Sequence, residues 1–431
     1  MRNNLVALGL GSNLDQPLEY LRQALAQIRR IEHLKVLKVS SIYESDAQLP
    51  ENASSEWNLK YLNAVVLCEV SKEIDPAALL FILKNVEVKM GRLQSERWAP
   101  RTIDIDLLCW NDLHLNEKDL ILPHPRMMER PFVILPLLEV CPEMSLASKP
   151  LWLNEWVAEK PFNTIKSKKY FWPRFVGVLN LTTDSFSDGG QLMTTDTLLQ
   201  QAEKLLKDGA EILDLGAEST RPRAHLISEE VEFKNLSWGL DLVRSLKKKY
   251  SFKISLDCRR PQVIERLLEG HSVEYLNDVS GFNSKDMQKI LKKNKLNAFV
   301  MHSLSVPADP LKVLEIHENP AEVLKLWWIK RQRELVKFGI AEDRLVFDPG
   351  IGFGKTKEQN LFILSHLEQL SEITSPIMIG HSRKSYQNLF SKREANERDL
   401  ETALVTAKMN LAFVQFLRVH DVETQKITLS S

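Results

Sequence analysis

The run FVGVLN, residues Phe175–Asn180, is apolar for most of its length and ends in a polar residue. Seven further short apolar runs follow it, separated by segments with helical spacing: EILDLG (211–216), KISLDC (253–258), EYLNDVS (274–280), AFVMH (298–302), LVFDPG (345–350), IMIGHS (377–382) and FLRVHD (416–421). Short strands that alternate with helices form a parallel sheet. Eight such units in about 260 residues predict a (β/α)₈ barrel of the TIM type.

The polar residues of these runs stand at their carboxyl ends. They are Asn180, Asp214, Asp257, Asn277, Asp278, His302, Asp348, Ser382, Arg383, His420 and Asp421. One strand that ends in Asp is uninformative, because such residues also begin turns. In a barrel, however, the carboxyl ends of all strands meet at one rim, which is where the active sites of this fold lie. The pattern therefore predicts an active site at that rim.

The composition is that of an ordinary globular protein, and it excludes some classes of function. The 431 residues suggest two or three domains of about 100–200 residues each. Lys and Arg (57) balance Asp and Glu (57), so no net basic charge indicates nucleic acid or an anionic membrane as a partner. No apolar run could span a bilayer, and the amino terminus lacks a signal-peptide pattern. The four cysteines are scattered, so we expect reduced thiols in a cytoplasmic protein.

The first half of the chain has a different rhythm, in which strands and helices alternate irregularly. Apolar runs predict strands at 6–10, 34–43, 61–70 and 103–110, and helical spacing predicts helices after Pro17, from Pro76 to near Gly91, and over 132–140. This order is typical of an α+β domain. The polar, basic stretch Glu159–Lys169 has no apolar period and is the predicted linker. We therefore expect domains over 1–158 and 171–431, with a linker over 159–170.

The motif RWAPRTIDIDLL, residues Arg97–Leu108, carries the sharpest local signal in the first half. Asp104 and Asp106 are two residues apart on a predicted strand, so their carboxylates lie on the same face. Two adjacent carboxylates repel each other unless a cation lies between them, and oxygen ligands of this kind suit Mg²⁺. Several basic residues stand nearby and could bind a triphosphate: Arg92, Arg97, Arg101, His124 and Arg130. The alternative is an exposed acidic strand with surface arginines.

Four motifs resemble those of 6-hydroxymethyl-7,8-dihydropterin pyrophosphokinase: GLGSNL (9–14), YLNAVV (61–66), RWAPRTIDIDLL and LPHPRMMERPF (122–132). The resemblance covers residues 1–145 and implies a ferredoxin-like α+β fold that transfers pyrophosphate from ATP to the pterin. By motif, it implies two Mg²⁺ on Asp104 and Asp106, phosphate contacts from Arg92, Arg101, His124 and Arg130, and pterin or substrate contacts from Asn63, Tyr61, Phe132 and Trp98. One departure concerns residues 44–60, a segment that is longer than the family's pterin-binding loop and lacks Gly.

Five motifs of the second half resemble those of dihydropteroate synthase: LNLTTDSFSDGG (179–190), LGAESTRP (215–222), FDPGIGFGK (347–355), GHSRKS (380–385) and RVHD (418–421). The resemblance covers residues 172–431 and implies that p-aminobenzoate displaces pyrophosphate from the activated pterin. By motif, it implies pterin contacts from Asp257, Asn277, Asp348, Lys384 and Arg418, pyrophosphate contacts from Asn180, Thr220, Arg221, Ser382, Arg418 and His420, Mg²⁺ on Asn180, and a p-aminobenzoate pocket of Pro222, Phe353, Ser382 and Lys384. The departures are Thr183, Arg223, Cys258–Arg260 and His381.

Two other readings remain open at this point. The barrel could belong to a pterin-binding methyltransferase, although that class does not need the phosphate-binding motifs. The first domain could be a binding or dimerisation module without catalysis, although Asp104, Asp106 and Arg101 argue for an enzyme. The family resemblance also implies that the barrel forms a homodimer. The expected ligands are ATP, hydroxymethyl-dihydropterin, p-aminobenzoate and Mg²⁺.

Overall fold

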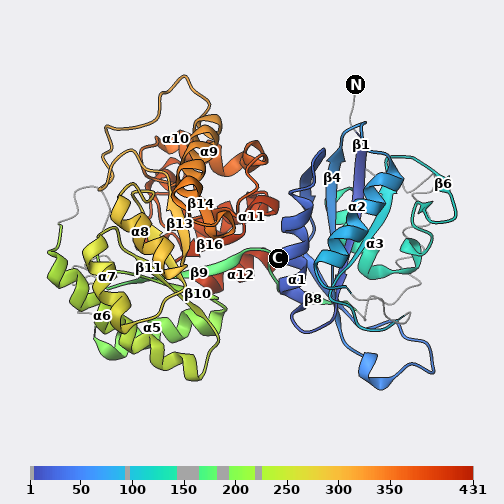
Figure 1. Ribbon diagram of the computed structural model, residues 1–431, viewed down its shortest axis with the longest axis horizontal. Coiled ribbons are helices and arrows are strands. Elements are labelled where there is room, and N and C mark those ends of the chain that lie inside the picture. The colour runs from blue at the N-terminus through green and yellow to red at the C-terminus, as the bar shows by residue number, and fades with distance from the viewer. Residues whose placement is uncertain (1–3, 93–97, 143–164, 182–193, 219–225, 431) are drawn as a thin grey trace. The chain divides into compact units, whose positions relative to one another are not determined.

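The computed structural model describes residues 4–92, 98–142, 165–181, 194–218 and 226–430, without the side chains of residue 128 and residues 165–169. Contacts divide the chain into two compact units, one that ends at Trp172 and one that begins at Pro173 (Figure 1). Within the described ranges, no helix combines the length and the apolar character that a membrane crossing requires. The predicted site residues Thr220 and Arg221, together with Pro222, lie outside the described residues.

The first unit is built on a six-stranded sheet whose paired strands are antiparallel. The strand order is β5 (Asp104–Trp110), β1 (Asn4–Ser12), β4 (Tyr61–Val70), β3 (Ile42–Ser45) and β8 (Ile165–Tyr170), and β2 (Leu34–Val39) also pairs with β4. The helices are α1 (Pro17–Ile28), α2 (Pro76–Lys89) and α3 (Pro131–Val140), and β6 (Leu115–Asn116) pairs with β7 (Ile121–Leu122). Single 3₁₀ turns cover Ser55–Trp57 and Met127–Glu129. The predicted α+β class is confirmed.

Local chemistry explains where these elements begin and break. Helix α2 starts after Asp75, whose carboxylate accepts from the backbone N–H of Ala78 at 2.7 Å, with Pro76 in the first turn. The single strand predicted over 34–43 is wrong, because the structure has two strands, β2 and β3. Ser40 lies between them, and its hydroxyl accepts from Val65 N–H at 2.9 Å in addition to the backbone bond between the same residues. That side-chain bond interrupts the regular ladder.

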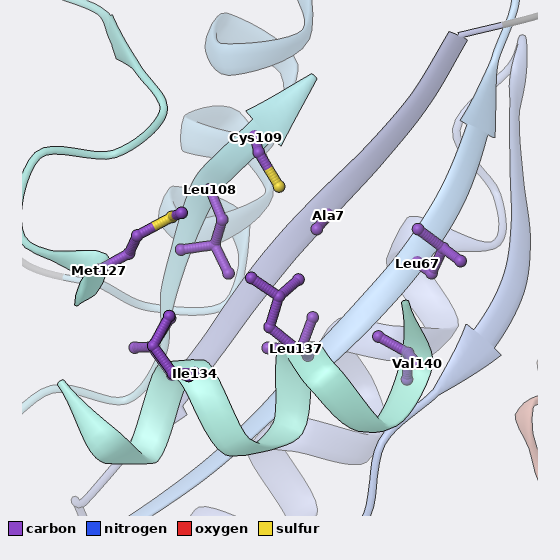
Figure 2. Packing of buried hydrophobic residues seen from close by; sticks show 10 residues of the cluster. Ala7, Leu67, Leu108, Cys109, Met127, Ile134, Leu137 and Val140 are labelled. Atoms are coloured by element: carbon purple, nitrogen blue, oxygen red, sulfur yellow. The ribbon is translucent and has the colours of Figure 1, made fainter. Parts of the chain in front are cut away.

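Helix α3 covers the face of the sheet that carries Ala7 and Leu67 (Figure 2). Ala7 lies opposite Leu67 in the ladder of β1 and β4, so their side chains share one face. Ile134, Leu137 and Val140 repeat at helical spacing and pack on this face. Pro136 lies inside α3, where its lack of an N–H removes one backbone hydrogen bond of the helix. The other helices, α1 and α2, pack against each other and against β1, β4 and β5.

Part of the predicted linker is a strand of the first unit. β8 pairs with β3, with Ile42 opposite Tyr170 and Ser45 opposite Ile165. The chain then reaches Trp172, which is buried and donates its indole N–H to the carbonyl of Ser40 at 2.7 Å. Arg22 on α1 donates to the carbonyls of Phe171 and Trp172 at 2.9 and 3.0 Å. The sequence did not reveal this strand because the stretch has no apolar period. As an edge strand, β8 is held by backbone pairing with β3 and does not need a buried face.

The second unit is an eight-stranded parallel sheet wrapped into a barrel, as predicted. In the sheet the order is β14 (Leu345–Asp348), β13 (Asn297–Met301), β12 (Tyr275–Asp278), β11 (Lys253–Asp257), β10 (Ile212–Gly216), β9 (Arg174–Asn180), β16 (Phe416–Val419) and β15 (Met378–Ile379). A parallel bridge from Phe347 to Ile377 and the bond from Phe347 N–H to Pro376 O join the two end strands. The barrel is therefore closed between β14 and the two residues that directly precede β15.

Helices follow the strands and surround the barrel (Figure 1). They are α5 (Thr195–Asp208), α6 (Glu229–Ser245), α7 (Pro261–Gly270), α8 (Lys285–Asn294), α9 (Pro320–Phe338), α10 (Lys357–Ser365), α11 (Asp399–Lys408) and α12 (Val422–Ser430). Short 3₁₀ turns cover Leu246–Lys248, Glu342–Arg344, Leu367–Leu370, Ser385–Leu389, Ala395–Glu397 and Leu411–Phe413. Helices α6, α8 and α10 begin after residue types that favour helix starts. The side chains of Ser228, Ser284 and Thr356 accept from N–H groups of the first turn.

The barrel interior changes from apolar to polar along the strands. Its lower layer is a cluster from seven strands: Val176, Ile212, Tyr275, Phe299, Val346, Met378 and Phe416. Alternate residues of a strand face the same side, so the next inward positions are two residues further on. These include Asp214, Asn277, Asp348 and Arg418, which lie above Ile212, Tyr275, Val346 and Phe416. The apolar layer supports the polar one, as the orientation of the eight runs requires.

We expect the two units to fold as separate fragments when the chain is cut after Trp172. A fragment of residues 1–172 should unfold cooperatively, whereas residues 1–167 should be less stable by about 3 kcal/mol or more, because the buried Trp172 and part of β8 are lost. Denaturant titration followed by circular dichroism measures the difference. Trp172→Ala within the fragment of residues 1–172 separates the contribution of the indole from that of the strand. Equal stability of the two fragments would contradict the packing of Trp172.

Candidate active sites

The first unit contains a cavity of about 400 Å³ next to the carboxylates of β5. The cavity is lined by Tyr61, Asn63, Arg92, Trp98, Arg101, Asp104, Asp106, His124, Arg130 and Phe132, all of which were predicted for this half. Arg97, which was predicted beside them, lies outside the described residues. They come from β4, β5, the start of α3 and the loops between these elements. Gly9 and Gly11 of β1 also line the cavity, and they lie opposite Asp106 and Asp104 in the ladder. The small residues of β1 thus leave room beside the acidic pair.

The two carboxylates of β5 differ in their surroundings. Arg92 donates to one oxygen of Asp104 at 2.7 Å, and Arg101 donates to the other at 2.9 Å. Burial alone would raise the pKa of Asp104, but Arg92, Lys84 and Arg101 outweigh it and lower the pKa. Burial and the charge of Asp104 raise the pKa of Asp106, which has no arginine at hydrogen-bond distance among the described residues. Asp104 is therefore a carboxylate that two arginines already neutralise, whereas the carboxylate of Asp106 lacks such a partner and could bind a cation.

The expectation that two unpaired carboxylates face each other is wrong in one respect, because side chains already neutralise Asp104. Two of the residues responsible were not predicted. Lys84 and Glu87 stand on α2, and the Lys84 ammonium lies 4.0 Å from Asp104 and 3.9 Å from Asp106. Glu87 accepts from Arg92 and from the backbone N–H of Ile105 at 2.6 Å. Their i, i+3 spacing could have suggested a pair on α2, but only the fold brings α2 against β5.

Aromatic and amide groups also line the cavity. Asn63 is buried and donates to the hydroxyl of Ser45 at 2.9 Å. The guanidinium of Arg126 lies 5.3 Å from the ring centre of Trp98, and these two residues also border a smaller hollow of about 290 Å³ with Gln48 and Pro50. Residues of the unusual segment 44–60 therefore take part in the cavity wall. Burial lowers the pKa of His124, although the charge of Asp106 opposes this.

At the carboxyl end of the barrel, Arg418 joins two carboxylates from different strands. Its Nε donates to Asp214 Oδ2 at 2.6 Å, and its Nη2 donates to Asp257 Oδ2 at 2.8 Å. Asn277 donates to the same Asp214 oxygen at 3.0 Å. Burial raises the pKa of Asp257 to about 7, with Asp214 acting in the same direction and Arg418 against it. Asp214 was identified as a strand end but was not among the predicted ligand contacts.

Three buried polar atoms in this region lack a hydrogen-bond partner within the described part of the chain. They are Asp214 Oδ1, Asn277 Oδ1 and Ser255 Oγ. A buried polar atom without a partner costs free energy, and native proteins have few of them. Two of the three are oxygens that can only accept, and their residues are joined to each other by the bond from Asn277 Nδ2 to Asp214 Oδ2. The barrel interior thus offers unpaired acceptor oxygens to a ligand that has N–H donors.

The loop after β14 carries two further predicted residues. Asp348 accepts from Gly350 N–H at 2.7 Å, and the ammonium of Lys384 lies 4.4 Å from the ring centre of Phe353. Gly350 has φ of +65°, and a Cβ there would lie 1.9 Å from the carbonyl oxygen of His302. Only glycine fits this position. The loop therefore holds Asp348 and Phe353 at the rim beside Lys384.

A buried lysine that was not predicted fixes the same loop. Lys355 donates to Gly350 O, Phe353 O and His302 Nδ1 at 3.0, 2.8 and 3.0 Å. Burial lowers the pKa of Lys355 to about 7, with Asp348 acting in the opposite direction. The three acceptors account for all three N–H groups of an ammonium. Lys355 was visible in FDPGIGFGK, but only the tertiary structure shows that it ties the loop to β13.

The remaining predicted residues occupy the neighbouring strand ends. Ser382 and His420 contact each other, with 2.9 Å between Ser382 Oγ and His420 Nδ1. Asn180 ends β9 opposite Gly216 of β10. Arg260, part of the unusual sequence after β11, donates to Glu218 and to the carbonyl of Ile227 at 2.8 Å. Arg260 thereby contacts one residue on each side of the range 219–225, which includes Thr220 and Arg221.

Comparison with known proteins decides the family. A family model of 7,8-dihydro-6-hydroxymethylpterin-pyrophosphokinase matches residues 7–142, and a model described as pterin binding enzyme matches residues 176–420. The folate synthesis bifunctional protein of Chlamydia trachomatis is 33% identical over 99% of this chain and 97% of its own length. This chain belongs to the bifunctional folate synthesis proteins. A relative with the same description from Arabidopsis thaliana is 31% identical over 97% of this chain and 93% of its own length.

Solved structures agree with this assignment. Dihydropteroate synthase from Anaplasma phagocytophilum with bound 6-hydroxymethylpterin-monophosphate has a TM-score of 0.54 and 29% identity, over 60% of this chain and 97% of its own. The Yersinia pestis synthase, solved with a sulfonamide drug, has a TM-score of 0.54 and 29% identity, over 60% and 92%. A Plasmodium falciparum HPPK-DHPS shares the fold over 99% and 94%, with a TM-score of 0.53 and 22% identity.

The folate synthesis enzyme therefore has two transferase activities, as predicted. Its pyrophosphokinase transfers pyrophosphate from ATP to 6-hydroxymethyl-7,8-dihydropterin, and its dihydropteroate synthase condenses the product with p-aminobenzoate, releasing pyrophosphate. The methyltransferase reading of the barrel is set aside, and so is the reading of the first domain as a module without catalysis.

The raised pKa of Asp257 predicts how the binding of pterin to the synthase depends on pH. If the ionised carboxylate accepts N–H groups of the ligand, affinity should be constant above about pH 7 and fall about tenfold for each pH unit below it, since the carboxylate fraction falls in that ratio. Calorimetric titration of 6-hydroxymethylpterin between pH 5.5 and 8.5 measures this. Asp257→Asn is the matched control and should bind weakly with a flat profile. A flat wild-type profile would exclude Asp257 as the titrating ligand group.

Proposed function

We propose that the cavity of the first unit binds ATP and hydroxymethyl-dihydropterin side by side, with Mg²⁺ held by Asp104 and Asp106. The fit of the metal rests on the acidic pair. The side chains of Asp104 and Asp106 are 24% and 32% exposed, and Asp106 has no arginine partner among the described residues. No group of three or more His, Cys, Asp or Glu residues suited to a metal occurs in the described ranges. Two protein carboxylates, completed by phosphate oxygens and water, match what Mg²⁺ prefers.

The basic residues of the cavity have a role in the transfer itself. The pterin hydroxyl oxygen bonds to the β-phosphorus of ATP and loses its proton to solvent, the bond from that phosphorus to the α-phosphate oxygen breaks, and AMP leaves. Bound Mg²⁺ would neutralise charge on the phosphate oxygens. Arg92 and Arg101 now pair with Asp104 and would contact the triphosphate, together with Arg130 and His124. Charge-assisted bonds of this kind stabilise the negative charge that moves to the leaving group.

The opposite wall of the cavity would recognise the pterin. Tyr61 and Phe132 would hold its flat ring between them, as aromatic faces favour, with Trp98 in the same wall. Asn63 can both donate to and accept from the edge of the ring, and its burial makes such bonds strong. Ser45 and Gln48 belong to the segment that departs from the family pattern, and they would supply part of the ring-edge contacts.

We propose that the pterin of the synthase binds above the apolar layer of the barrel, between Asp257, Asn277, Asp348 and Arg418. The unpartnered Asp214 Oδ1 and Asn277 Oδ1 carry this proposal, because the aminopyrimidine edge of a pterin presents N–H donors that buried acceptors need. Asp214 is thereby added to the predicted set. The edge of the Arg418 guanidinium is engaged by Asp214 and Asp257, so its flat face is available to stack on the ring.

The pyrophosphate and p-aminobenzoate would bind further out on the rim. Ser382, His420 and Arg418 would contact the pyrophosphate together with Thr220 and Arg221, and Asn180 would ligate a Mg²⁺ beside it. Phe353, Lys384 and Ser382 would form the p-aminobenzoate pocket with Pro222, where the cation of Lys384 over Phe353 supplies charge beside an apolar face. Arg260 supports this region by holding Glu218 and Ile227.

The condensation needs no nucleophile from the protein. The bond from the pterin methylene carbon to the pyrophosphate oxygen breaks, the amino nitrogen of p-aminobenzoate bonds to that carbon, and the nitrogen loses a proton. Arg418, Ser382 and His420 would stabilise the leaving pyrophosphate, and the buried carboxylates would stabilise a pterin that becomes cationic as the bond breaks. Orientation of the two substrates supplies the remaining rate enhancement.

We also propose a cytoplasmic location and a homodimer formed through the barrel. None of the four cysteines, all within the described ranges, forms a disulfide, and three of them are buried, which fits a reducing compartment. Exposed apolar side chains occur on α11 and α12, where Leu400, Leu404 and Ile427 are 47%, 53% and 63% exposed. Apolar side chains at that exposure suit a subunit interface.

Replacing Asp106 by Asn should reduce pyrophosphokinase turnover on the order of a hundredfold or more, because a neutral ligand weakens a site that has only two protein carboxylates. The release of AMP from ATP with hydroxymethyl-dihydropterin measures the loss. Synthase activity of the same protein, assayed with pterin pyrophosphate, should stay unchanged and shows that the chain is folded. Wild-type turnover by Asp106→Asn would exclude the metal assignment.

Replacing Arg418 by Ala should weaken pterin pyrophosphate binding to the synthase on the order of a hundredfold, since stacking and charge are lost together. Arg418→Lys keeps the charge for Asp214 and Asp257 but not the planar face, so it separates recognition from stability. Lys384→Ala should abolish condensation and reduce competition between sulfonamides and p-aminobenzoate. Pyrophosphokinase turnover is the internal control for each variant. Unchanged affinity in both Arg418 variants would place the pterin elsewhere.

A further inference from the structure

The ammonium of Lys84 lies at the acidic pair where a metal ion would bind. Its Nζ is 4.0 Å from Asp104 Oδ1 and 3.9 Å from Asp106 Oδ1, so it faces one oxygen of each carboxylate. It is the cation nearest to Asp106 in the described part of the chain. The Lys84 side chain is 41% exposed and lines the cavity. A positive charge already occupies the region that two carboxylates would share with a divalent cation.

The position of Lys84 is built into the fold. Nζ donates to Glu87 Oε1 at 2.8 Å and to the carbonyl of Ile105, between the two aspartates, at 3.0 Å. Glu87 is itself buried, accepts from Ile105 N–H at 2.6 Å and pairs with Arg92. The glutamate is thereby fixed by three partners, one of which is the backbone of the metal-bearing strand. The lysine is directed at the acidic pair rather than at bulk water.

This arrangement has a consequence for metal binding. A divalent cation between Asp104 and Asp106 would lie within a few ångströms of the ammonium, and like charges at that range repel each other. The cation can bind well only when Lys84 moves away. ATP brings several negative oxygens into the same cavity, and these offer the displaced ammonium a new partner.

We propose that Lys84 is an internal counter-ion that competes with divalent metal for Asp104 and Asp106 until nucleotide arrives. The proposal rests on the metal site proposed above. It makes Lys84 a positioning residue of the pyrophosphokinase, which keeps the acidic pair close together without metal and couples the entry of metal to the entry of ATP. A lysine that only links α2 to β5 would affect stability and leave metal affinity unchanged.

The test measures Mn²⁺ binding to the nucleotide-free full-length enzyme through the electron paramagnetic resonance signal of free Mn²⁺. Lys84→Gln removes the charge and keeps an N–H donor for the carbonyl of Ile105, and it should bind Mn²⁺ on the order of tenfold more tightly than wild type. Lys84→Met serves as a second neutral variant. Lys89→Gln, an exposed position on the same helix, removes the same charge elsewhere and should bind as wild type does.

Two further variants identify the site that is being measured. Asp106→Asn should lose the Mn²⁺ that wild type binds, and Lys84→Gln combined with Asp106→Asn should lose the tightened binding. If Asp106→Asn changes nothing in either background, the metal assignment fails and the role of Lys84 fails with it. If Asp106→Asn removes binding while both neutral Lys84 variants bind Mn²⁺ no more tightly than wild type, the metal site stands and the counter-ion role is overturned.

Discussion

Arg418 carries the charge balance on which the interior of the barrel depends. Two carboxylates from neighbouring strands, Asp214 and Asp257, are placed inside the barrel, and each would be costly there without a cation. The guanidinium can serve both because its donors form a planar fork that reaches two acceptors at once. Asp257 still keeps a raised pKa, which shows that one arginine only partly compensates for two buried acids. The interior is therefore stable enough to fold and polar enough to bind a ligand.

The first unit also has two neighbouring carboxylates, and it balances them with more cationic side chains and greater exposure to solvent. Asp104 is paired with two arginines, and Asp106 faces only the longer contact with Lys84. Both carboxylates are partly exposed, so screening by solvent lowers the cost of bringing them together. The two acidic clusters thus suit different chemistry. The first is open enough for the proposed hydrated cation and phosphates, and the second is more enclosed, as the proposed contact with the donor edge of a heterocycle requires.

Neither site would be positioned without the apolar layers beneath it. In the barrel, Ile212, Tyr275, Val346 and Phe416 pack in the lower layer, and the period of two along each strand then places Asp214, Asn277, Asp348 and Arg418 directly above them. In the first unit, α3 closes one face of the sheet through Ile134, Leu137 and Val140. The predicted residues Phe132 and Arg130 stand at the start of that helix, so core packing and the wall of the cavity are set by one element.

The sequence by itself determined the two fold classes and the eight barrel strands, and it predicted most of the residues of the two candidate sites, because period and strand-end polarity are properties of the chain alone. It also indicated the acidic pair, since two residues apart on a strand means one face. It did not reveal β8, which has no apolar period, nor the break between β2 and β3 at Ser40. Only the tertiary structure revealed the roles of four charged residues: Lys84, Glu87, Lys355 and Asp214, the partner of Arg418. Each acts across a large separation in sequence or through a backbone carbonyl, and no local pattern records which distant strand or loop a charged side chain will meet. The balance of buried charge, and with it the pKa of each carboxylate, is decided only when the chain has folded.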